Sequence, residues 1–452
     1  MCGWIASLTS DVTPGLERML HRGIRSQATT YGHGSAGHVR LPIVGVGEEW
    51  DQPVQDGNQC YMYAGEILDF RERDPSAQCD LPLVIRTWKE KGPDGFKCFD
   101  GFWSVAVFDR HHESLHIFCD YLAQKPTYWR SDIGAAASEL DALAALSAVT
   151  PDEIYFSAVI KWGYCPETDR TPYSEIKKLL PGEHVVMTDT GYRRRIADPL
   201  VPRRCDMKKE IEQAVRRRVL SSDVPVACLV SGGLDSSIVY TLAKRYGTVV
   251  PYFADSGDAE EQLRVSAVVG SQKAKTIYWD LVSRERAMRY MQEPIDLGSL
   301  VPQTALSDQV TERVCLTGDG ADEVFGGYGR ASRYDSQMSD IYHELVAWHL
   351  PRLDRIMMRN KIEVRTPFLA RKVVEGAMAL QPIHRRDKVY LRELFRSELP
   401  PGIADAPKKP LRTAEVDSDR EAVSRDMVAA FRRGKWPMTL SERIVRLREM
   451  AK

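Results

Sequence analysis

The sequence predicts two consecutive domains: an α+β sandwich, then an α/β domain with a parallel sheet and a helical C-terminal part. Residues 1 to about 195 contain short segments in which Val, Ile, Phe and Tyr alternate with polar residues, as in 60–68 and 101–110. After residue 206, helical and strand-like segments alternate, which is typical of βαβ units. The stretch 196–206, with two prolines and no periodicity, separates the two patterns.

The individual segments support this division. In the first half we expect further strands at 114–121 and 184–195 and a helix over 81–92. In the second half, helical spacing of apolar residues predicts a helix over 208–222. The nearly continuous apolar run 224–230 is typical of a buried parallel strand. Further strands are expected at 249–254, 275–281 and 313–318, and the charged stretch from about 413 is interpreted as surface helices.

Composition excludes several classes of protein. The 452 residues carry a net charge of −1, which gives no bulk electrostatic reason to bind nucleic acid or membrane. We interpret the runs Arg193–Arg195 and Arg216–Arg218 as solvated faces. No apolar run reaches the roughly 18–20 residues of a membrane span, and the N-terminus lacks a signal-type stretch, so a cytoplasmic protein is expected. The nine scattered cysteines form no CxxC pair, which favours free thiols over disulfides or zinc ligands.

The motif SGGLDSS, residues 231–237, follows the predicted strand at 224–230 and opens a helix. Such a turn directs backbone N–H groups and a helix N-terminus at an anion, while the serines add hydroxyl donors for phosphate oxygens. Asp235 would repel phosphate unless Mg²⁺ lies between them. The alternative is an ordinary Gly-rich turn. The motif differs from the GxxxxGK[ST] loop of kinases and GTPases.

A second motif, LTGDGADEVFGGY at 316–328, also follows an apolar strand. It gathers Asp319, Asp322 and Glu323 with glycine-rich backbone, which suits metal and nucleotide contact, although an acidic surface turn is the alternative. The first motif resembles the PP-loop of ATP pyrophosphatases, which form an adenylate and release pyrophosphate. Both motifs in this order resemble the synthetase domain of asparagine synthetases.

Two further segments extend the resemblance. KIEVRTPFLA (361–370) is similar to the family's VEARxPFLD segment, with Arg365 kept and Ala370 in place of the acid. VYLRELFRSELPPGI (389–403) is similar to its helix ending in LPxxI. Lys408, in APKKPLR, stands where the family has a lysine that acts on departing pyrophosphate, although the family's preceding Arg is Ala406 here.

The resemblance also implies roles at the nucleotide site. Asp235 and Asp322 would hold Mg²⁺, and Asp319 stands where a family acid lies near the reacting intermediate. A carboxylate there could take a proton from attacking ammonia. The implied contacts with ATP and pyrophosphate are Leu229, Ser231, Gly233, Asp235, Ser236, Ser237 and Gly318.

Cys2 directly follows Met1, so removal of Met1 would make it an N-terminal nucleophile whose own α-amine serves as base. An MCG start alone means little. However, residues 1–196 resemble a class II glutamine amidotransferase domain of the N-terminal-nucleophile type, an αββα sandwich, and residues 205–452 resemble the synthetase domain. HRG at 21–23 is similar to the family's HRGPD, and AGEIL at 64–68 to its NGEIY.

This second resemblance implies a glutamine site. Arg40 would bind the glutamine carboxylate, a role suited to a planar two-donor guanidinium, and Asp80 the amine. Glu66 is retained from NGE, and Gly65 would supply an oxyanion-hole N–H. The Asn of that motif is Ala64 here, and losing one oxyanion donor typically costs about 10²–10³ in rate.

Three functions remain open. The first is a glutamine-dependent asparagine synthetase that uses ATP, Mg²⁺, aspartate and glutamine, with ammonia passing inside the protein and with a homodimer as a family-level expectation. The second is a relative that amidates or cyclises another carboxylate in specialised metabolism, as β-lactam synthetases do, with an impaired glutaminase and free ammonia as donor. The third is a non-catalytic binding protein on the same scaffold, which the intact nucleotide motifs disfavour.

Overall fold

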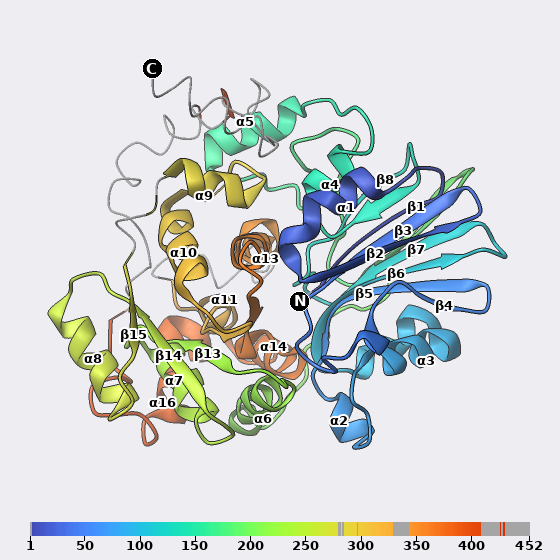
Figure 1. Cartoon of the computed structure of the whole chain (residues 1–452). Coiled ribbons are helices and arrows are strands. Elements are labelled where there is room, and N and C mark those ends of the chain that lie inside the picture. Colours follow the sequence, from blue (N-terminus) through green and yellow to red (C-terminus); the bar gives the residue numbers. More distant parts are fainter. Residues whose placement is uncertain are drawn as a thin grey trace.

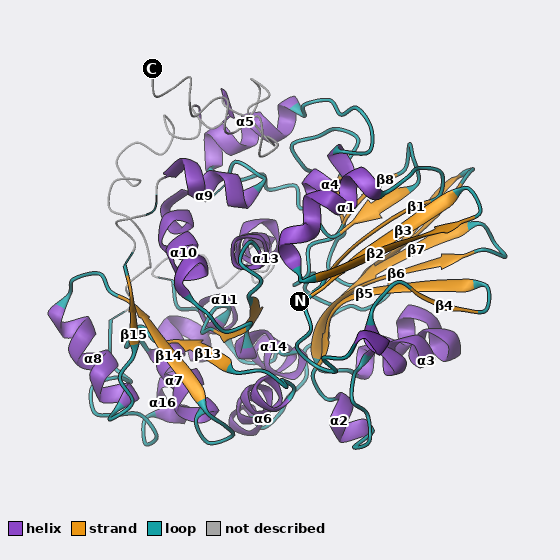
Figure 2. Ribbon diagram, in the orientation of Figure 1, coloured by secondary structure: helices purple, strands orange, loops and turns teal. Residues whose placement is uncertain are grey.

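The computed structural model describes residues 2–278, 282, 284–295, 297–328, 343–407, 425 and 428–429. The chain forms a strand-rich half and a helix-rich half that lie side by side (Figures 1 and 2). Two antiparallel sheets are followed by a five-stranded parallel sheet with helices, as the sequence predicted. No helix in the described part of the chain is long and apolar enough to cross a membrane.

The strand-rich half has four layers. One sheet has the order β10-β8-β9-β1-β3-β2 and the other β12-β11-β7-β6-β5-β4. The strands are β1 (Gly3–Ser7), β2 (Arg25–Tyr31), β3 (Gly34–Arg40), β4 (Val54–Asp56), β5 (Gln59–Ile67), β6 (Gly101–Asp109), β7 (Ser114–Cys119), β8 (Tyr128–Arg130), β9 (Ala135–Ala137), β10 (Lys177–Lys178), β11 (Glu183–Thr188) and β12 (Gly191–Ile196). The helices are α1 (Thr13–Met19), α2 (Phe70–Arg73), α3 (Leu81–Lys91), α4 (Leu140–Ala144) and α5 (Glu153–Trp162).

Alternation of side chains along the strands builds these layers. In β1, Trp4 and Ala6 face the core between the two sheets, while Ile5 faces the core under α1 and α4. Successive side chains of a strand point to opposite faces, so a strand covered on both sides carries apolar residues throughout. Helix α3 covers the other sheet (Figure 1). The arrangement is the αββα sandwich that the sequence predicted.

The helix-rich half is an α/β unit. Its parallel sheet has the order β15-β14-β13-β16-β17. The strands are β13 (Val226–Leu229), β14 (Val249–Ala254), β15 (Lys275–Ile277), β16 (Val314–Leu316) and β17 (Glu363–Arg365). The helices are α6 (Met207–Leu220), α7 (Leu234–Ala243), α8 (Ala259–Val269), α9 (Arg284–Met291), α10 (Leu297–Gln309), α11 (Ala321–Phe325), α13 (Leu350–Met358), α14 (Arg371–Met378), α15 (Pro382–Arg385) and α16 (Val389–Phe395).

The strand order has a switch point at β13. The chain runs outward from β13 through β14 to β15 and then returns to place β16 on the other side of β13. In open parallel sheets, ligands bind outside the carboxyl ends of the strands at such a point. The motifs at 231–237 and 316–328 follow β13 and β16, so the topology brings them to this edge together.

Buried ion pairs hold the two halves together. Arg22, 1% exposed, lies 2.9 Å from Glu139 and 2.9 Å from Asp354 of α13. Lys125 lies 3.2 Å from the other oxygen of Asp354. Although burial raises the pKa of Asp354, these two cations hold it below its ordinary value. A carboxylate shared by two buried cations fixes α13 against the sandwich.

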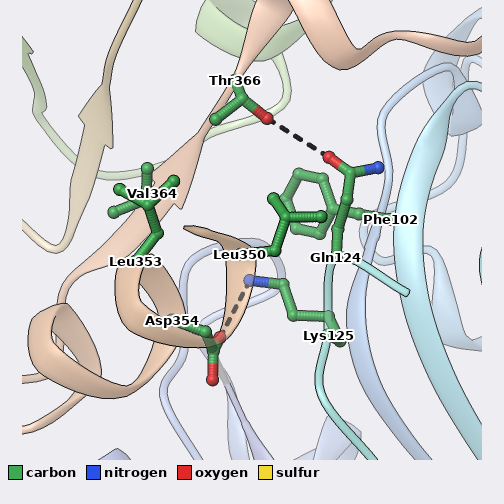
Figure 3. A pocket seen from close by; sticks show the side chains of 8 residues that line it. All are labelled: Phe102, Gln124, Lys125, Leu350, Leu353, Asp354, Val364 and Thr366. Carbon is green, nitrogen blue, oxygen red and sulfur yellow. Dashed lines mark hydrogen bonds and ion pairs between the residues drawn. The ribbon is translucent and has the colours of Figure 1, made fainter. Parts of the chain in front are cut away.

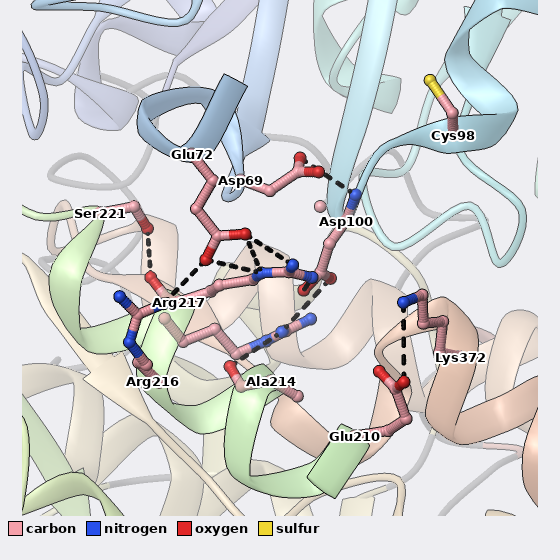
Figure 4. A network of polar contacts seen from close by, with 12 residues as sticks. Asp69, Glu72, Cys98, Asp100, Glu210, Ala214, Arg216, Arg217, Ser221 and Lys372 are labelled. Atoms are coloured by element: carbon pink, nitrogen blue, oxygen red, sulfur yellow. Dashed lines mark hydrogen bonds and ion pairs between the residues drawn. The ribbon is translucent and has the colours of Figure 1, made fainter. Parts of the chain in front are cut away.

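The arginine run at 216–218 is not the solvated face that the sequence suggested. Arg218 is fully buried, and Arg217 lies 2.7 Å from Glu72 of α2 and 3.2 Å from Asp100. Arg216 also pairs with Glu72, at 2.8 Å (Figure 4). The run docks α6 onto the sandwich, a contact that local sequence could not reveal. Arg193 and Arg195, in contrast, are exposed on the edge strand β12, as expected.

We predict that Asp354→Ala destabilises the chain by about 3–5 kcal/mol, because it leaves Arg22 and Lys125 buried without their carboxylate. The loss would be measured by urea unfolding monitored by tryptophan fluorescence. Asp56→Ala is the matched control. Its carboxylate pairs with Lys89 at the surface, both side chains being more than 40% exposed, and its loss should cost less than about 1 kcal/mol. Equal losses of unfolding free energy in the two variants would contradict the role of Asp354 as the shared partner of Arg22 and Lys125.

Candidate active sites

The turn at 231–237 lies between the end of β13 and the start of α7. Gly233 is the N-terminal cap of α7, and the Ser231 N–H donates to Ser236 Oγ at 3.0 Å. The Ser231 hydroxyl also lies 3.0 Å from Ser236 Oγ. Ser237 is fully buried, and its hydroxyl has no hydrogen-bond partner within the described residues. The turn therefore combines hydroxyl donors with a helix N-terminus, an arrangement suited to phosphate.

The two glycine-rich motifs are in direct contact. A Cβ on Gly318 would lie 2.8 Å from Asp235 Cβ and 2.9 Å from the Ser236 nitrogen. Only glycine permits so close an approach of the segment after β16 to the first turn of α7. Leu229, at the end of β13, pairs with Tyr252 of β14 beside the same edge. The predicted nucleotide residues thus gather at one place in the fold.

Asp235 and Asp322 converge on a single cationic group. Lys388 Nζ contacts Asp235 Oδ2 and lies 2.6 Å from Asp322 Oδ1. Two carboxylates that can share one cation fit Mg²⁺, which takes carboxylate together with phosphate oxygens. The structure thus brings Asp235 and Asp322 together at the switch point, and their assignment to Mg²⁺ stays a prediction.

Asp319 and Glu323 flank Asp322. Asp319 is partly exposed at the strand end, and its N–H donates to Thr317 Oγ1 at 3.4 Å. Glu323 is buried and contacts the Tyr328 hydroxyl, with His349 Nε2 at 3.5 Å. Burial, and then the charge of Asp322, raise the pKa of Glu323 to about 7. Asp319 is accordingly the more accessible carboxylate of the two.

Cys2 directly precedes β1 and is half-buried. The Arg22 Nε–H donates to the Cys2 carbonyl oxygen at 3.1 Å, and the Leu41 N–H hydrogen-bonds the thiol sulfur. Burial raises the pKa of the thiol, while the Leu41 N–H and Arg40 act in the opposite direction. Arg22 therefore ties the candidate nucleophile to Asp354 in the helix-rich half.

Glu66 and Asp80 form a buried acidic pair near Cys2. Asp80 Oδ2 accepts from the Tyr63 hydroxyl and the Ile67 N–H, both at 2.8 Å. Glu66 lies 4.0 Å from Arg365, and its Oε2 has no hydrogen-bond partner among the described residues. Burial, followed by the neighbouring Glu363 and Asp80, raises the pKa of Glu66 well above its ordinary value. Such a pair favours a positively charged or N–H-rich ligand.

Arg40 is engaged by a loop of its own domain. Its terminal nitrogens donate to the carbonyl oxygens of Val44, Gly45 and Gly47 and to Asp51, the last at 2.8 Å. A glutamine carboxylate would have to replace some of these bonds. The predicted role of Arg40 remains compatible with its position at the end of β3, next to Leu41.

The oxyanion-hole segment lies in the centre of β5. Ala64 pairs with Ser104 and Gly65 with Trp103 of β6. The Ser104 hydroxyl cannot readily replace the missing Asn side chain, because it already contacts Trp4 Nε1 at 3.0 Å and Thr127 Oγ1 at 2.6 Å. Position 64, just before Gly65, therefore has no side-chain donor of its own, and Ser104 does not supply one.

A small cavity lies at the boundary between the halves. It has a volume of about 20 Å³, enough for one water-sized molecule, and lies between β6 and the 124–125 loop on one side and α13 and β17 on the other (Figure 3). Gln124 accepts from the Thr366 hydroxyl at 3.2 Å across it. The lining residues are Phe102, Gln124, Lys125, Leu350, Leu353, Asp354, Val364 and Thr366.

Lys408 lies outside the described residues. Lys388 was missed, although it directly precedes the segment 389–403 that carried a family resemblance. Its only sequence signal is a cation before an apolar helix, which does not distinguish it from a surface lysine. All nine cysteines are free, as expected.

Known families match both halves. The family described as Glutamine amidotransferase domain matches residues 1–196, and the family described as Asparagine synthase matches 206–343 and 336–433. An amidotransferase-type sandwich joined to an α/β unit of the asparagine synthase type defines the class of glutamine amidotransferases that carry a synthetase domain. The chain belongs to the asparagine synthase family.

Curated relatives align over most of the chain. Asparagine synthetase B of Escherichia coli is 25% identical over 81% of this chain and 72% of its own length. The nodule asparagine synthetase of Pisum sativum is 25% identical over 84% and 70%, respectively. Asparagine synthetase 3 of Arabidopsis thaliana is 26% identical over 89% and 76%. The solved glutamine phosphoribosylpyrophosphate amidotransferase of B. subtilis aligns with a TM-score of 0.34 at 13% identity, over 70% of this chain and 81% of that chain.

We predict that Gly318→Ala weakens ATP binding at least about tenfold, or 1.4 kcal/mol, because the added methyl group would push the start of α7 away from its position. Isothermal titration calorimetry with ATP would measure the loss. Gly247→Ala is the control, since its Cβ would meet only Val219 Cγ1 at 3.3 Å, away from the motifs. Unchanged ATP affinity in Gly318→Ala would mean that ATP does not bind at this edge of the sheet.

Proposed function

We propose that the protein is a glutamine-dependent asparagine synthetase. It would adenylate the side-chain carboxylate of aspartate with ATP and amidate it with ammonia released from glutamine, giving AMP and pyrophosphate. One observation carries the proposal: the 231–237 turn, Gly318 and Asp322 meet at the switch point of the sheet, in a chain that also holds Cys2 in a docked amidotransferase domain.

The adenylation half of the reaction suits the residues at this edge. A carboxylate is a poor electrophile, and transfer of AMP to its oxygen creates a good leaving group. The donors of the 231–237 turn would bind the phosphate groups, and Asp235 and Asp322 would hold Mg²⁺, which neutralises phosphate charge. Asp319 would accept the proton that attacking ammonia loses. Lys408 would act on departing pyrophosphate.

The nitrogen-supplying half would run on Cys2. The thiolate attacks the glutamine amide carbon to form a thioester and release ammonia, and water then hydrolyses the thioester to glutamate. Arg40, Glu66 and Asp80 would bind the amino-acid end of glutamine, and the Gly65 N–H would stabilise the oxyanion. Ammonia would pass through the interior, and the small cavity beside β6 and α13 would be one step on such a route.

A second function is favoured by two positions in this chain. Ala64 offers no hydrogen-bond donor in the oxyanion hole, and Ala370 replaces an acid of the family segment. A chain with these changes could amidate another carboxylate and draw on free ammonia. This enzyme would keep the adenylation chemistry and differ in its acceptor and nitrogen source.

Pyrophosphate release with ATP and Mg²⁺ distinguishes the two functions. With aspartate and glutamine, we expect asparagine and glutamate to form in equal amounts. Cys2→Ala should abolish the reaction with glutamine and keep the reaction with ammonium, since only the thioester step needs the thiol. No pyrophosphate with aspartate under either nitrogen source would refute the asparagine assignment and point to another carboxylate.

Restoring the missing donor is a separate prediction. Ala64→Asn should raise kcat for glutamine hydrolysis about 10²-fold, because it returns a side-chain donor to the oxyanion hole. Glutamate release would be followed with and without ATP. Ammonium-dependent synthesis should remain unchanged and serves as the internal control. An unchanged glutaminase rate would mean that another group already fills the role.

A further inference from the structure

We call the carboxyl edge of the parallel sheet, where 231–237 and 316–328 meet, the nucleotide edge. Lys388 is its least expected component. It lies just before α16 and is 3% exposed, although a lysine is seldom buried without a specific partner. Its ammonium group contacts Asp235 from the 231–237 turn and lies 2.6 Å from Asp322 in the second motif. One lysine thus bridges the two carboxylates that the family resemblance assigns to the metal.

The surrounding backbone is shaped around this side chain. Asp387 and Lys388 have φ values of +52° and +57°, in the left-handed region that residues with a Cβ seldom adopt. The Asp387 N–H donates to the Gly326 carbonyl oxygen at 2.9 Å. A Cβ on Gly327 would lie 1.9 Å from Asp322 Oδ1 and 2.1 Å from Lys388 Cε. The last glycine of the second motif therefore makes room for the lysine and its partner.

We propose that the Lys388 ammonium group occupies the metal position in the nucleotide-free enzyme. Its ammonium group is the counter-ion of Asp235 and Asp322 until a divalent cation arrives with the triphosphate of ATP. The displaced ammonium then turns to the phosphate oxygens beside the serines of the turn. This inference rests on the proposed nucleotide site.

The physical argument concerns charge. Buried Asp322 and partly buried Asp235 both contact the Lys388 ammonium and need a cation between them. The ammonium supplies one positive charge through a flexible four-carbon stem that can move without backbone rearrangement. A divalent cation alone would have to displace the ammonium and leave it buried without an anion. A cation bound to triphosphate brings that anion with it. Metal and nucleotide should therefore bind with positive coupling, each raising the affinity for the other by the same factor.

The test measures Mn²⁺ binding to the whole, nucleotide-free protein by electron paramagnetic resonance. Lys388→Met keeps most of the stem and removes the charge, and it should bind free Mn²⁺ at least about tenfold more tightly than the unmodified chain. Lys372→Met is the matched control, because Lys372 is an exposed lysine that pairs with Glu210 at 3.6 Å, and it should change nothing. Pyrophosphate should bind Lys388→Met at least about tenfold more weakly.

The outcomes separate this inference from the function on which it rests. If the unmodified chain fails to bind Mn²⁺ even with ATP, the proposed nucleotide site is wrong. If it binds Mn²⁺ with ATP, and Lys388→Met binds free Mn²⁺ no more tightly than the unmodified chain, the role of Lys388 is wrong. Thermal unfolding checks that the variant folds, and Lys388→Gln replaces it if it does not. Adding Asp235→Asn to Lys388→Met or to Lys388→Gln should abolish the gain in Mn²⁺ affinity.

Discussion

The buried contact of Arg22 with Asp354 is the constraint on which much of this molecule depends. The same guanidinium binds the Cys2 carbonyl oxygen, Glu139 and the α13 carboxylate. It therefore joins Cys2, the segment just before α4 and helix α13 of the helix-rich half. A buried ion pair costs desolvation energy and adds little stability compared with apolar packing, but its geometry is specific. Here that specificity fixes the two candidate sites relative to one another.

The second organising constraint is the strand order of the parallel sheet. Because β16 returns beside β13, the segments that follow these strands meet, and Gly318 packs against the first turn of α7. The charges at this edge then need an internal balance before any ligand arrives. In the proposed arrangement Lys388 supplies it from a segment in which Asp387 and Lys388 both have positive φ values.

The two sites differ in how their charges are balanced. At the nucleotide edge a lysine lies between the carboxylates, whereas near Cys2 the carboxylates of Glu66 and Asp80 are buried together and Arg365 is 4.0 Å from Glu66. Arg365 itself is committed to Glu363 at 2.7 Å and to the Arg218 and Ser221 carbonyls of α6 and its C-terminus. Both sites therefore depend on residues from segments far apart in the chain.

The sequence by itself determined the fold class, and it predicted the division near residue 196 and a nucleotide site at the two glycine-rich motifs. Strand alternation, a continuous apolar run and glycine-rich turns act locally and can be read from neighbouring residues, and so can Cys2 and the missing donor at Ala64. Only the tertiary structure decided that Arg217 and Arg218 dock a domain and that Lys388 bridges Asp235 and Asp322. Charged side chains obtain their partners from distant segments, and no local pattern distinguishes a buried, paired lysine or arginine from a solvated one.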